Sequence, residues 1–558
     1  MKAPVPIFRG RGRFVAIRFT AAIFLLSLLS SASTKFYDDD PLWQEVNSQD
    51  ASRVKFYEPQ LIYDVAENMF ARPGDKDFNR RAQNVNTIDE VPDGSWFTNR
   101  TGRRALTPEQ VARGSNTGHG PSPGKWTVIA AKTDGVTPGF TIRDSSGLVW
   151  FLKFDPPGYR GMATGTEVVV AKLFWALGYH ITEYYISQLR PSDLIIDQSA
   201  VFTPPSGIKR AMHLSDINTL LKEVEGDPDG TYRVIASLSI PGKMVGRIRF
   251  YGTRPDDPND LVSHENHREL RGYGVFAAWF NHVDAKSINT LDTLVDEKGH
   301  GVVRHYLLDF GSTLGSAGVA PRDYWEGYEY LLEPGSQIGK GIAAFGFYIL
   351  PWRTDPFYES RMIGRLPLNN TEWDPEQWRP RVANPAFIRS RLDDKFWAAR
   401  KAMDITDEMI RAAVAEGKFG DPEAERFLAR TLIDRRNSIG RRYLPAINPI
   451  VDPALDASGA LTFGNAAVDA KFAAAPESYK ATWSTFDNAT GHTTPIGETT
   501  SKEQRMQAPI ELPSARGAFI KVELSAISGT HPTWARPITT YFRRQPDGWG
   551  LVGFERIP

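Results

Sequence analysis

Short apolar runs between turn residues characterise the chain from residue 125 onward. WTVIAAK, FTIRDSS and LVWFLKF alternate or cluster apolar residues around the turn sequences DGVTPG and DSSG, a pattern typical of antiparallel strands. TEVVVAKLFWALG then repeats apolar residues at helical spacing and ends at Gly178, a common helix stop. YYISQL and VIASLSI predict two more strands, separated by a polar insert. We therefore expect an antiparallel sheet with one main helix over residues 125–260.

Helical periodicity dominates the following segment. HENHRELRGYGVFAAWF places Leu270, Tyr273, Ala277 and Phe280 on one face, and Ser263 stands where it could cap that helix. Further helices are predicted over 387–402, 406–416 and 421–440, the last opening with a capping Asp421 and a Pro422 at the first helical position. The apolar run at 341–352 is too short to span a bilayer and is predicted to be buried core. The segment 261–445 should thus be mainly helical.

The two flanking regions have a different texture. Residues 34–124 are rich in Asp, Asn, Gly and Pro with brief aromatic islands, which predicts an extended, loop-rich arm. Beyond about 445, runs such as YKATWSTF, AFIKVELSAI and PITTYFRR alternate between turn residues. They predict a small, separate β domain over 455–558, closed by a hairpin around QPDG.

The N-terminal segment is typical of an export signal. Four arginines precede the apolar run 19–30, which ends in small residues: Arg9, Arg11, Arg13 and Arg18. This order predicts a signal peptide over residues 1–33, cleaved near Ala32 or Ser33, with an uncleaved anchor as the alternative. In either case the arginines should stay inside while the rest crosses the membrane. We expect a protein of the periplasm or cell envelope, with membrane or envelope association.

Composition narrows the function classes further. With 558 residues the chain is too long for a single core. Lys and Arg together number 66, as do Asp and Glu, so there is no overall basic field and no nucleic-acid partner is expected. The sequence contains no cysteine, which excludes disulfides and thiolate metal sites. An exported protein without disulfides fits a bacterial envelope.

Five side chains suggest phosphoryl transfer. The stretch 280–315 contains Asp284, Asn289 five residues later, and Asp309 within an Asp-Phe-Gly triplet. Their oxygens suit Mg²⁺, although each residue alone is also a common turn former. Lys153 ends an apolar strand, and Glu167 lies in the first turn of the predicted helix that follows. Glu167 could pair with Lys153 or complete a capping box begun at residue 164, and the sequence leaves both roles open.

The same residues carry a family resemblance. HVDAKSIN and HYLLDFGSTLG resemble the catalytic and metal loops of the protein-kinase-like superfamily, whose marks are His-Arg-Asp…Asn and Asp-Phe-Gly. The likeness is closer to its atypical branch, the phosphatidylinositol 3/4-kinases and HipA-type kinases. FLKFDPPGYRGMATGTEVVVAKLFWALGY is similar to the lysine strand and following helix of that branch. The resemblance covers about residues 125–445.

The resemblance implies an α+β, two-lobed kinase-like fold. The N-lobe, 125–260, would hold an antiparallel sheet plus a helix, and 261–445 would form a mainly helical C-lobe. Lys153 would contact the phosphates of ATP and pair with Glu167, Asp284 would be the catalytic carboxylate, and Asn289 and Asp309 would bind Mg²⁺. His282 would be scaffold, and the phosphate loop would be DGVTPGF, with the residues Gly135 and Gly139.

Three departures limit what the resemblance implies. Val283 replaces the Arg of the catalytic loop, the two glycines are a weak loop signature, and no Ala-Pro-Glu follows the triplet. We therefore predict an exported phosphotransferase that uses ATP and Mg²⁺ on an unidentified acceptor, which could be a protein, a lipid or a small molecule. Because ATP is scarce outside the cytoplasm, the alternative is an exported pseudokinase acting as a binding or scaffold protein.

Other candidate sites have less support. His264 and His267 are spaced like a metal pair, but cap and surface roles are favoured for them. The acidic stretch 252–260 would suit calcium or a rigid loop equally well. A Gly-x-Ser-x-Gly nucleophile motif is absent, so the sequence does not support a serine hydrolase.

Overall fold

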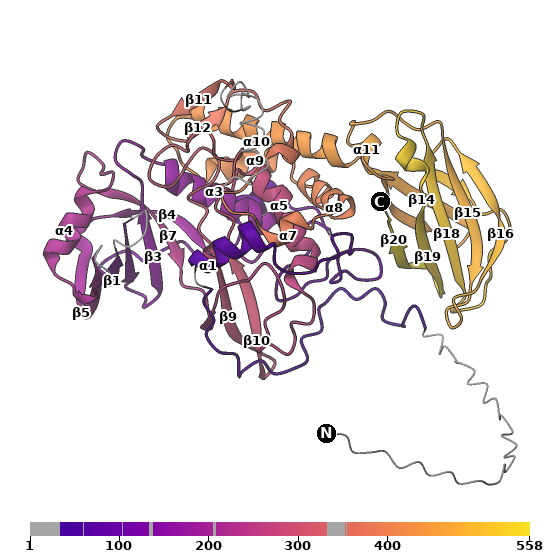
Figure 1. The fold of residues 1–558 in the computed structure, drawn as a ribbon, viewed down its shortest axis with the longest axis horizontal. Helices are drawn as coiled ribbons and strands as arrows, with labels where there is room; N and C mark the ends of the chain where they lie inside the picture. The colour runs from indigo at the N-terminus through magenta and orange to yellow at the C-terminus, as the bar shows by residue number, and fades with distance from the viewer. Residues whose placement is uncertain are drawn as a thin grey trace, which may run out of the picture.

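The computed structural model describes residues 34–59, 61–102, 104–132, 138–204, 208–331, 352 and 354–557. Figure 1 shows three regions along its long axis: a sheet at one end, a helical body in the middle and a second β region at the other. The fold is mixed α and β, as predicted. The predicted signal peptide, Gly135 and nearly all of 341–352 lie outside the described residues. Within them, no helix has the length and apolar character needed to cross a membrane.

The first region is a seven-stranded sheet in the order β4-β7-β3-β2-β1-β5-β6. Its strands are β1 (Trp126–Lys132), β2 (Gly139–Arg143), β3 (Val149–Phe154), β4 (Tyr184–Leu189), β5 (Leu194–Thr203), β6 (Arg210–Ala211) and β7 (Tyr232–Leu238). Neighbours are antiparallel except β1 and β5, which are parallel. The strand β5 was not predicted, because much of it is exposed and it lacks the apolar alternation that marks its neighbours. The helix α4 (Leu214–Lys222) follows β6.

The helix α3 (Met162–Leu177) begins earlier than predicted. Its N-cap is Gly161, in the left-handed conformation with φ 93°, and no side chain caps it from that position. Instead the buried carboxylate of Asp155 accepts hydrogen bonds from the amides of Gly161, Ala163 and Thr164, which satisfies the first turn. Of the two roles left open for Glu167, the capping box is therefore excluded, since Glu167 lies in the second turn.

The helical body contains α5 (Arg268–Trp279), α7 (Pro385–Ile388), α8 (Leu392–Met403), α9 (Asp407–Ala415) and α10 (Pro422–Tyr443). Asp421 caps α10 as predicted, accepting from the amides of Glu423 and Ala424. The predicted cap at Ser263 is wrong, because a 3₁₀ turn follows it and α5 begins only at Arg268. The predicted helix 387–402 is two helices, because the carboxylate of Asp394 accepts from the Arg391 amide and starts α8 anew.

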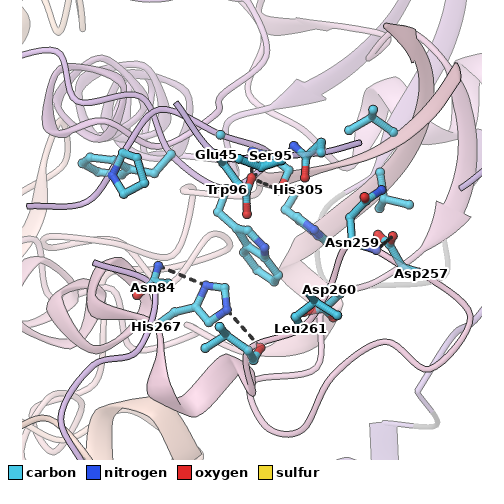
Figure 2. A pocket seen from close by; sticks show the side chains of 18 of the residues that line it. Glu45, Asn84, Ser95, Trp96, Asp257, Asn259, Asp260, Leu261, His267 and His305 are labelled. Carbon is cyan, nitrogen blue, oxygen red and sulfur yellow. Dashed lines mark hydrogen bonds between the residues drawn. The ribbon is translucent and has the colours of Figure 1, made fainter. Parts of the chain in front are cut away.

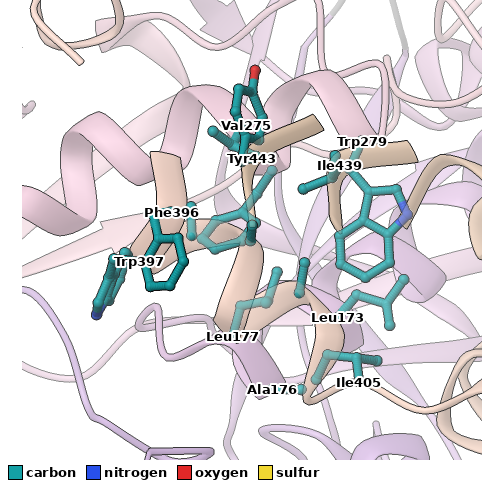
Figure 3. Close-up of a cluster of buried hydrophobic side chains, with 14 of the residues drawn as sticks. Leu173, Ala176, Leu177, Val275, Trp279, Phe396, Trp397, Ile405, Ile439 and Tyr443 are labelled. Carbon is teal, nitrogen blue, oxygen red and sulfur yellow. The ribbon is translucent and has the colours of Figure 1, made fainter. Parts of the chain in front are cut away.

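Apolar faces of α3 and of three helices of the body meet in one core (Figure 3). α3, α5, α8 and α10 contribute the buried residues Leu173, Ala176, Leu177, Val275, Trp279, Phe396, Trp397, Ile439 and Tyr443. Burial of this apolar surface is the main force that fixes α3 against the body. It therefore also fixes the position of Glu167, which α3 carries on its second turn.

The helical body also carries a two-stranded sheet, β11 (Phe357–Ser360) and β12 (Gly364–Pro367), and a three-stranded sheet that positions the central loop. The three-stranded sheet has the order β10-β9-β8, with β8 (Lys243–Gly246), β9 (Thr290–Glu297) and β10 (His300–Leu307). The β9–β10 register pairs Thr290 with Leu307, and just beyond it the Leu308 amide donates to the Asn289 carbonyl at 3.0 Å. The sheet thus brings Asn289 beside Asp309, which are distant in sequence.

The C-terminal β region, which we call the β unit, spans residues 450–557. Its strands are β13 (Ile450–Leu455), β14 (Ala460–Asn465), β15 (Ser478–Phe486), β16 (Thr493–Ser501), β17 (Arg505–Gln507), β18 (Phe519–Ile527), β19 (Ile538–Gln545) and β20 (Gly548–Glu555), in the sheets β13-β14-β17 and β16-β15-β18-β19-β20. β19 and β20 form the hairpin predicted around QPDG. Buried Leu444, Ile447 and Ile450 join its core to that of the helical body, so the unit is not isolated.

The arm, residues 34–124, is loop-rich as predicted but is not loosely attached. It contains α1 (Leu61–Ala66), the five-residue π-helix η1 (Glu67–Ala71) and α2 (Pro108–Arg113). Its aromatic island at 96–97 is buried in the main core, where the Phe97 ring meets the edge of Tyr179 at 5.8 Å between centroids. This aromatic island is a point where the arm packs onto the body.

Candidate active site

Three elements bring charged side chains together around Lys153. The residue lies near the end of β3, Glu167 lies on α3, and Asp309 follows β10. The Lys153 Nζ is 3.0 Å from Glu167 Oε1 and 2.8 Å from Asp309 Oδ1. We call these three residues the lysine centre. Glu167, the predicted partner of Lys153, therefore contacts it directly, and so does Asp309, which was predicted as a metal ligand; they are 14 and 156 residues away along the chain.

The charges of the lysine centre support one another. Burial disfavours the ammonium, but the carboxylates of Asp309 and Glu167 outweigh it and raise the pKa of Lys153 above its ordinary value. Burial also raises the pKa of Glu167, a shift that Lys153 opposes. The lysine is thus a permanent cation at neutral pH. It is held between one buried carboxylate and one that faces solvent.

Asp309 adopts a left-handed backbone conformation. Its φ is 59°, in the left-handed region that non-glycine residues seldom adopt. Such backbone strain persists where the surrounding structure imposes it, often at functional sites. Half of the Asp309 side chain is exposed, whereas that of Glu167 is 3% exposed. A ligand arriving from solvent could therefore reach Asp309 and Lys153 but not Glu167.

The loop after α5 carries Asp284 and Asn289. The Asn289 Nδ2 donates to the Asp284 carbonyl and to its Oδ2, both at 2.8 Å. Both of these bonds use Nδ2, so the amide oxygen Oδ1 is turned away from Asp284 and keeps its capacity for a cation. The side chains at the predicted five-residue spacing therefore form one hydrogen-bonded pair.

Two cations that were not predicted from the sequence flank Asp284. The Lys286 Nζ is 2.7 Å from Asp284 Oδ1, and the Arg381 guanidinium lies 3.7 Å from the same oxygen. Buried Glu326 holds Arg381 in place, accepting from its Nε at 2.6 Å. Burial alone would raise the pKa of Asp284, but Lys286, with Arg381 and Asn289, outweighs it and lowers that pKa. The Asp-x-Lys spacing could have identified Lys286, whereas no local signal marks Arg381.

His282 is a packing residue. Its ring is fully buried and lies 5.7 Å from the Phe310 ring and 6.0 Å from the Tyr273 ring. Burial lowers the pKa of His282 to about 4, so the imidazole is neutral at physiological pH. It joins the Asp284 loop to the Asp-Phe-Gly segment through ring contacts.

The predicted phosphate loop is only partly described. Gly139 lies at the start of β2 and pairs with Lys153 across the β2–β3 ladder. A Cβ at Gly139 would lie 2.6 Å from the Leu152 carbonyl oxygen, so the glycine permits close strand packing at this point. Its partner Gly135 lies outside the described residues, and the role of this loop in nucleotide binding stays a prediction.

The side chains of Asp309 and Asn289 suit a Mg²⁺ ion that is bound partly by substrate phosphates and water. They do not suit a metal ion held by protein side chains alone. The described ranges contain no group of three or more His, Asp or Glu side chains arranged to hold a metal ion. Mg²⁺ commonly binds through one or two protein oxygens together with substrate phosphates and waters. The half-exposed carboxylate of Asp309 and the amide oxygen of Asn289 supply oxygens of this kind. These two residues would hold the ion at the mouth of the lysine centre.

A second charged cluster lies elsewhere, around Trp96 (Figure 2). The His305 ring stacks on Trp96 with centroids 3.5 Å apart, and the rings of His264 and His267 meet its edges at 4.7 and 5.1 Å. We call these four residues the histidine cluster. Three of them, Trp96, His267 and His305, line a cavity of about 210 Å³ together with residues that include Glu45, Asp257 and Glu269.

Each imidazole of the histidine cluster is paired with a carboxylate. His264 Nε2 donates to Asp260 at 2.7 Å, His267 Nδ1 to Glu269 at 2.9 Å, and His305 Nδ1 to Asp292 at 2.7 Å. The expectation that His264 and His267 have surface or capping roles is therefore wrong: both are buried, and neither side chain caps a helix. They are buried because Trp96, which belongs to the arm, packs against both rings.

The acidic loop 252–260 is a rigid loop rather than a calcium site. Its carboxylates accept from neighbouring protein groups: Asp256 from the Lys55 amide, Asp257 from the Asn259 amide and Asp260 from the Arg254 amide. Within the part of the chain that the structure describes, no group of three or more such side chains is arranged to hold a metal ion. Of the two interpretations left open by the sequence, the contacts favour the loop.

Comparison with known proteins gives little identification. No family model matches the sequence, and no curated protein matches it. Solved structures that align with it include kinases. The Helicobacter pylori proinflammatory kinase CtkA aligns with a TM-score of 0.26 and 10% identity over 55% of this chain and 94% of that chain.

The Golgi casein kinase aligns with a TM-score of 0.26 and 9% identity over 72% of this chain and 96% of that chain. Its structure with Mn/ADP bound gives 0.26 and 10% over 73% and 97%. At this TM-score the superpositions do not establish how the folds correspond. Function must therefore be inferred from the side-chain contacts.

Proposed function

We propose that the protein is an exported phosphotransferase of atypical kinase-like fold that transfers the terminal phosphoryl group of ATP to a hydroxyl acceptor with the help of Mg²⁺. The observation that carries the proposal is the contact of one lysine with both Glu167 and Asp309. Buried ion pairs alone are common structural devices. Here the lysine and one carboxylate face solvent, next to a loop that presents a second carboxylate and an amide.

The chain's own residues divide the work of binding and orientation. Lys153 offers its ammonium to the phosphates, while Glu167 keeps that ammonium at the end of β3. Asp309 and Asn289 would hold Mg²⁺, which when bound neutralises phosphate charge. Asp284 orients the acceptor hydroxyl, and the cations Lys286 and Arg381 keep it ionised and fixed. An ionised carboxylate beside a hydroxyl accepts its hydrogen bond and points its oxygen toward the phosphorus.

Export is part of the proposal and has its own test. The arginines before the apolar run support transfer of the body across the membrane. A reporter enzyme that is active only outside the cytoplasm, fused after residue 60, should be active. Activity of a cytoplasm-only reporter at the same junction would refute export. The source of ATP in that compartment is then the question that separates an enzyme from an exported scaffold.

The transfer reaction is tested with the purified mature protein. We expect it to move radiolabel from γ-labelled ATP to at least one member of a mixed panel of proteins, lipids and small alcohols, with Mg²⁺ required. The Asp309→Asn variant, which keeps the size of the side chain, should lose this transfer. If the wild type binds nucleotide but labels nothing above the variant, the scaffold alternative replaces the enzyme.

A further inference from the structure

Residues 35–38 of the arm pack against the β unit, and Phe36 inserts among apolar side chains that we call the socket. Phe36 is 4% exposed and forms a separate apolar cluster with residues of β15, β18, β19 and β20: Phe486, Phe519, Tyr541 and Val552. Its ring centroid lies 5.0 Å from that of Tyr541 and 6.1 Å from those of Phe486 and Phe519. An aromatic side chain held on three sides by other rings is a typical anchor of peptide recognition.

The backbone around Phe36 is bound as well as its ring. The Asn488 side chain accepts from the Phe36 amide at 2.9 Å and donates to the Phe36 carbonyl at 2.8 Å. The Lys35 amide donates to the Asn488 carbonyl at 3.2 Å. Arg543 donates to the carbonyls of Tyr37 and Asp38 at 2.9 and 2.8 Å. Contacts to main-chain atoms hold a segment in one register, as in peptide-binding sites.

Charge completes the match between segment and socket. The Lys35 Nζ is 2.7 Å from Glu555 and 2.9 Å from the Tyr541 hydroxyl, and it lies 4.2 Å from the centre of the Tyr541 ring. Burial disfavours the ammonium of Lys35, but Glu555 and Tyr541 outweigh it and raise the Lys35 pKa. On the other side of Phe36, Asp38 faces Arg543 at 3.1 Å. Lys35 before the anchor and Asp38 after it therefore each have an oppositely charged partner on the β unit.

A glycine makes room for the ring. A Cβ at Gly553 would lie 2.5 Å from the Phe36 Cζ, closer than real Cβ contacts come. Any larger residue at this position of β20 would fill the space that Phe36 occupies. The socket is therefore shaped for an inserted aromatic side chain and is not a flat sheet face on which the arm happens to rest.

We propose that this face of the β unit is a peptide-binding site for a segment with a basic residue, an aromatic anchor next to it and an acidic residue two positions after the anchor, filled here by residues 35–38 of the same chain. The occupant belongs to the same chain as the site, so it is tethered to it. A tethered segment has a high effective concentration and blocks the site against a free peptide. Removing the anchor ring should open the site to a peptide of the same chemistry. The inference does not depend on phosphotransferase activity.

The test uses the full mature chain and a fluorescent peptide of the sequence TKFYDD. We expect the Phe36→Ala variant to bind this peptide, and the wild type to bind it about tenfold or more weakly because its own segment competes. A control peptide with Ala in place of the first aromatic residue should not bind Phe36→Ala. The double variant Phe36→Ala, Gly553→Leu should have lost the site.

A second route avoids the risk that Phe36→Ala does not fold. A protease recognition sequence between Pro41 and Leu42 lets the segment be released after folding. The labelled peptide should then bind only after cleavage. Absence of binding in the cleaved, still folded protein, or equal binding of the control peptide, would overturn the proposal.

Discussion

The lysine centre and the histidine cluster both surround cations with carboxylates, but they differ in exposure. In the lysine centre, 31% of the Lys153 side chain and 50% of the Asp309 side chain face solvent. In the histidine cluster, the side chains of His267 and Glu269 are 4% and 1% exposed. The first arrangement can exchange a protein contact for a ligand contact. The second has already used its charges inside the protein.

The difference shows why charge clustering alone does not identify an active site. Buried, mutually satisfied pairs are common structural features, and breaking one leaves an uncompensated charge. Perturbed ionisable groups become candidates for function when they also lie where a substrate can reach them. The lysine centre meets this condition. The histidine cluster is instead expected to stabilise the packing of the arm against the body.

The largest expected effect is that of Asp284→Ala, in the loop beside the lysine centre. Loss of the carboxylate that orients the acceptor should lower phosphate transfer by about 10² or more, while nucleotide affinity changes by no more than a few-fold. Single-turnover transfer and equilibrium nucleotide binding on the same preparation measure both quantities. A parallel loss of binding and transfer would mean that Asp284 supports the fold of the loop and not the reaction.

His267→Leu should have the opposite effect. It leaves Glu269 buried without its ion-pair partner, so the free energy of unfolding should fall by about 3 kcal/mol. Nucleotide binding at a temperature where the variant is folded should not change. Chemical denaturation followed by tryptophan fluorescence gives the stability. An unchanged stability would show that the His267–Glu269 pair does not stabilise the fold. Altered nucleotide binding would show that the histidine cluster and the lysine centre are coupled.

Arg381→Met tests a residue that no sequence motif marks. Arg381 contacts Asp284 and is held in place by Glu326. Because it acts on Asp284 and not on the nucleotide, we expect its loss to lower kcat by about tenfold while the KM for ATP stays constant. Arg381→Lys should recover part of the rate, because a cation near Asp284 is restored. Steady-state kinetics of the two variants give the answer. A rise in the KM for ATP with unchanged kcat would place Arg381 at the nucleotide instead.

The smallest expected effect is a pH dependence confined to the histidine cluster. Burial opposes the charge of His267, but Glu269 outweighs it and raises the His267 pKa above 6.5. Burial favours neutral Glu269, but His267 outweighs it and lowers the Glu269 pKa below 4.5. His267 therefore stabilises the fold fully below about pH 6.5 and loses its contribution as the pH rises through its higher folded pKa. Glu269 contributes above about pH 4.5 and loses its contribution as the pH falls.

A tenfold difference in proton affinity between the folded and unfolded protein corresponds to about 1.4 kcal/mol of stability. Unfolding free energies measured from pH 4 to 9 should show a decline at the alkaline end that His267→Leu lacks. The wild type and the variant losing stability in parallel above pH 6.5 would contradict the assignment. Lys153 should not contribute over this range, because its raised pKa lies above it.

Local patterns predicted much of the first sheet but not how its strands assemble. β1, β3 and β4 were placed closely because their apolar runs end at clear turns, whereas β5 pairs in parallel with β1 through a crossover that no local pattern encodes. The start of α3 was missed because its first turn is satisfied by Asp155, in the loop between β3 and the helix. Apolar periodicity marks neither the parallel pairing nor this capping contact.

The candidate site was predictable to a similar extent. Lys153, Glu167, Asp284, Asn289 and Asp309 were identified because each stands at the end of an apolar element or at a motif spacing. Arg381 and the burial of His264 and His267 were not, since each depends on a segment far along the chain. The aromatic islands of the arm were visible in the sequence, but their role as packing points on the body and the β unit was not.

The most direct measurement of the central claim is calorimetric titration of the mature protein with ATP, with and without Mg²⁺. The wild type should bind ATP more tightly with the ion than without it. Lys153→Met and Asp309→Asn should each weaken binding by about tenfold or more, the scale of losing one charged contact, and His267→Leu should bind as the wild type does. No nucleotide binding by the folded wild type, or equal binding by all four proteins, would contradict the assignment of the lysine centre as a nucleotide site.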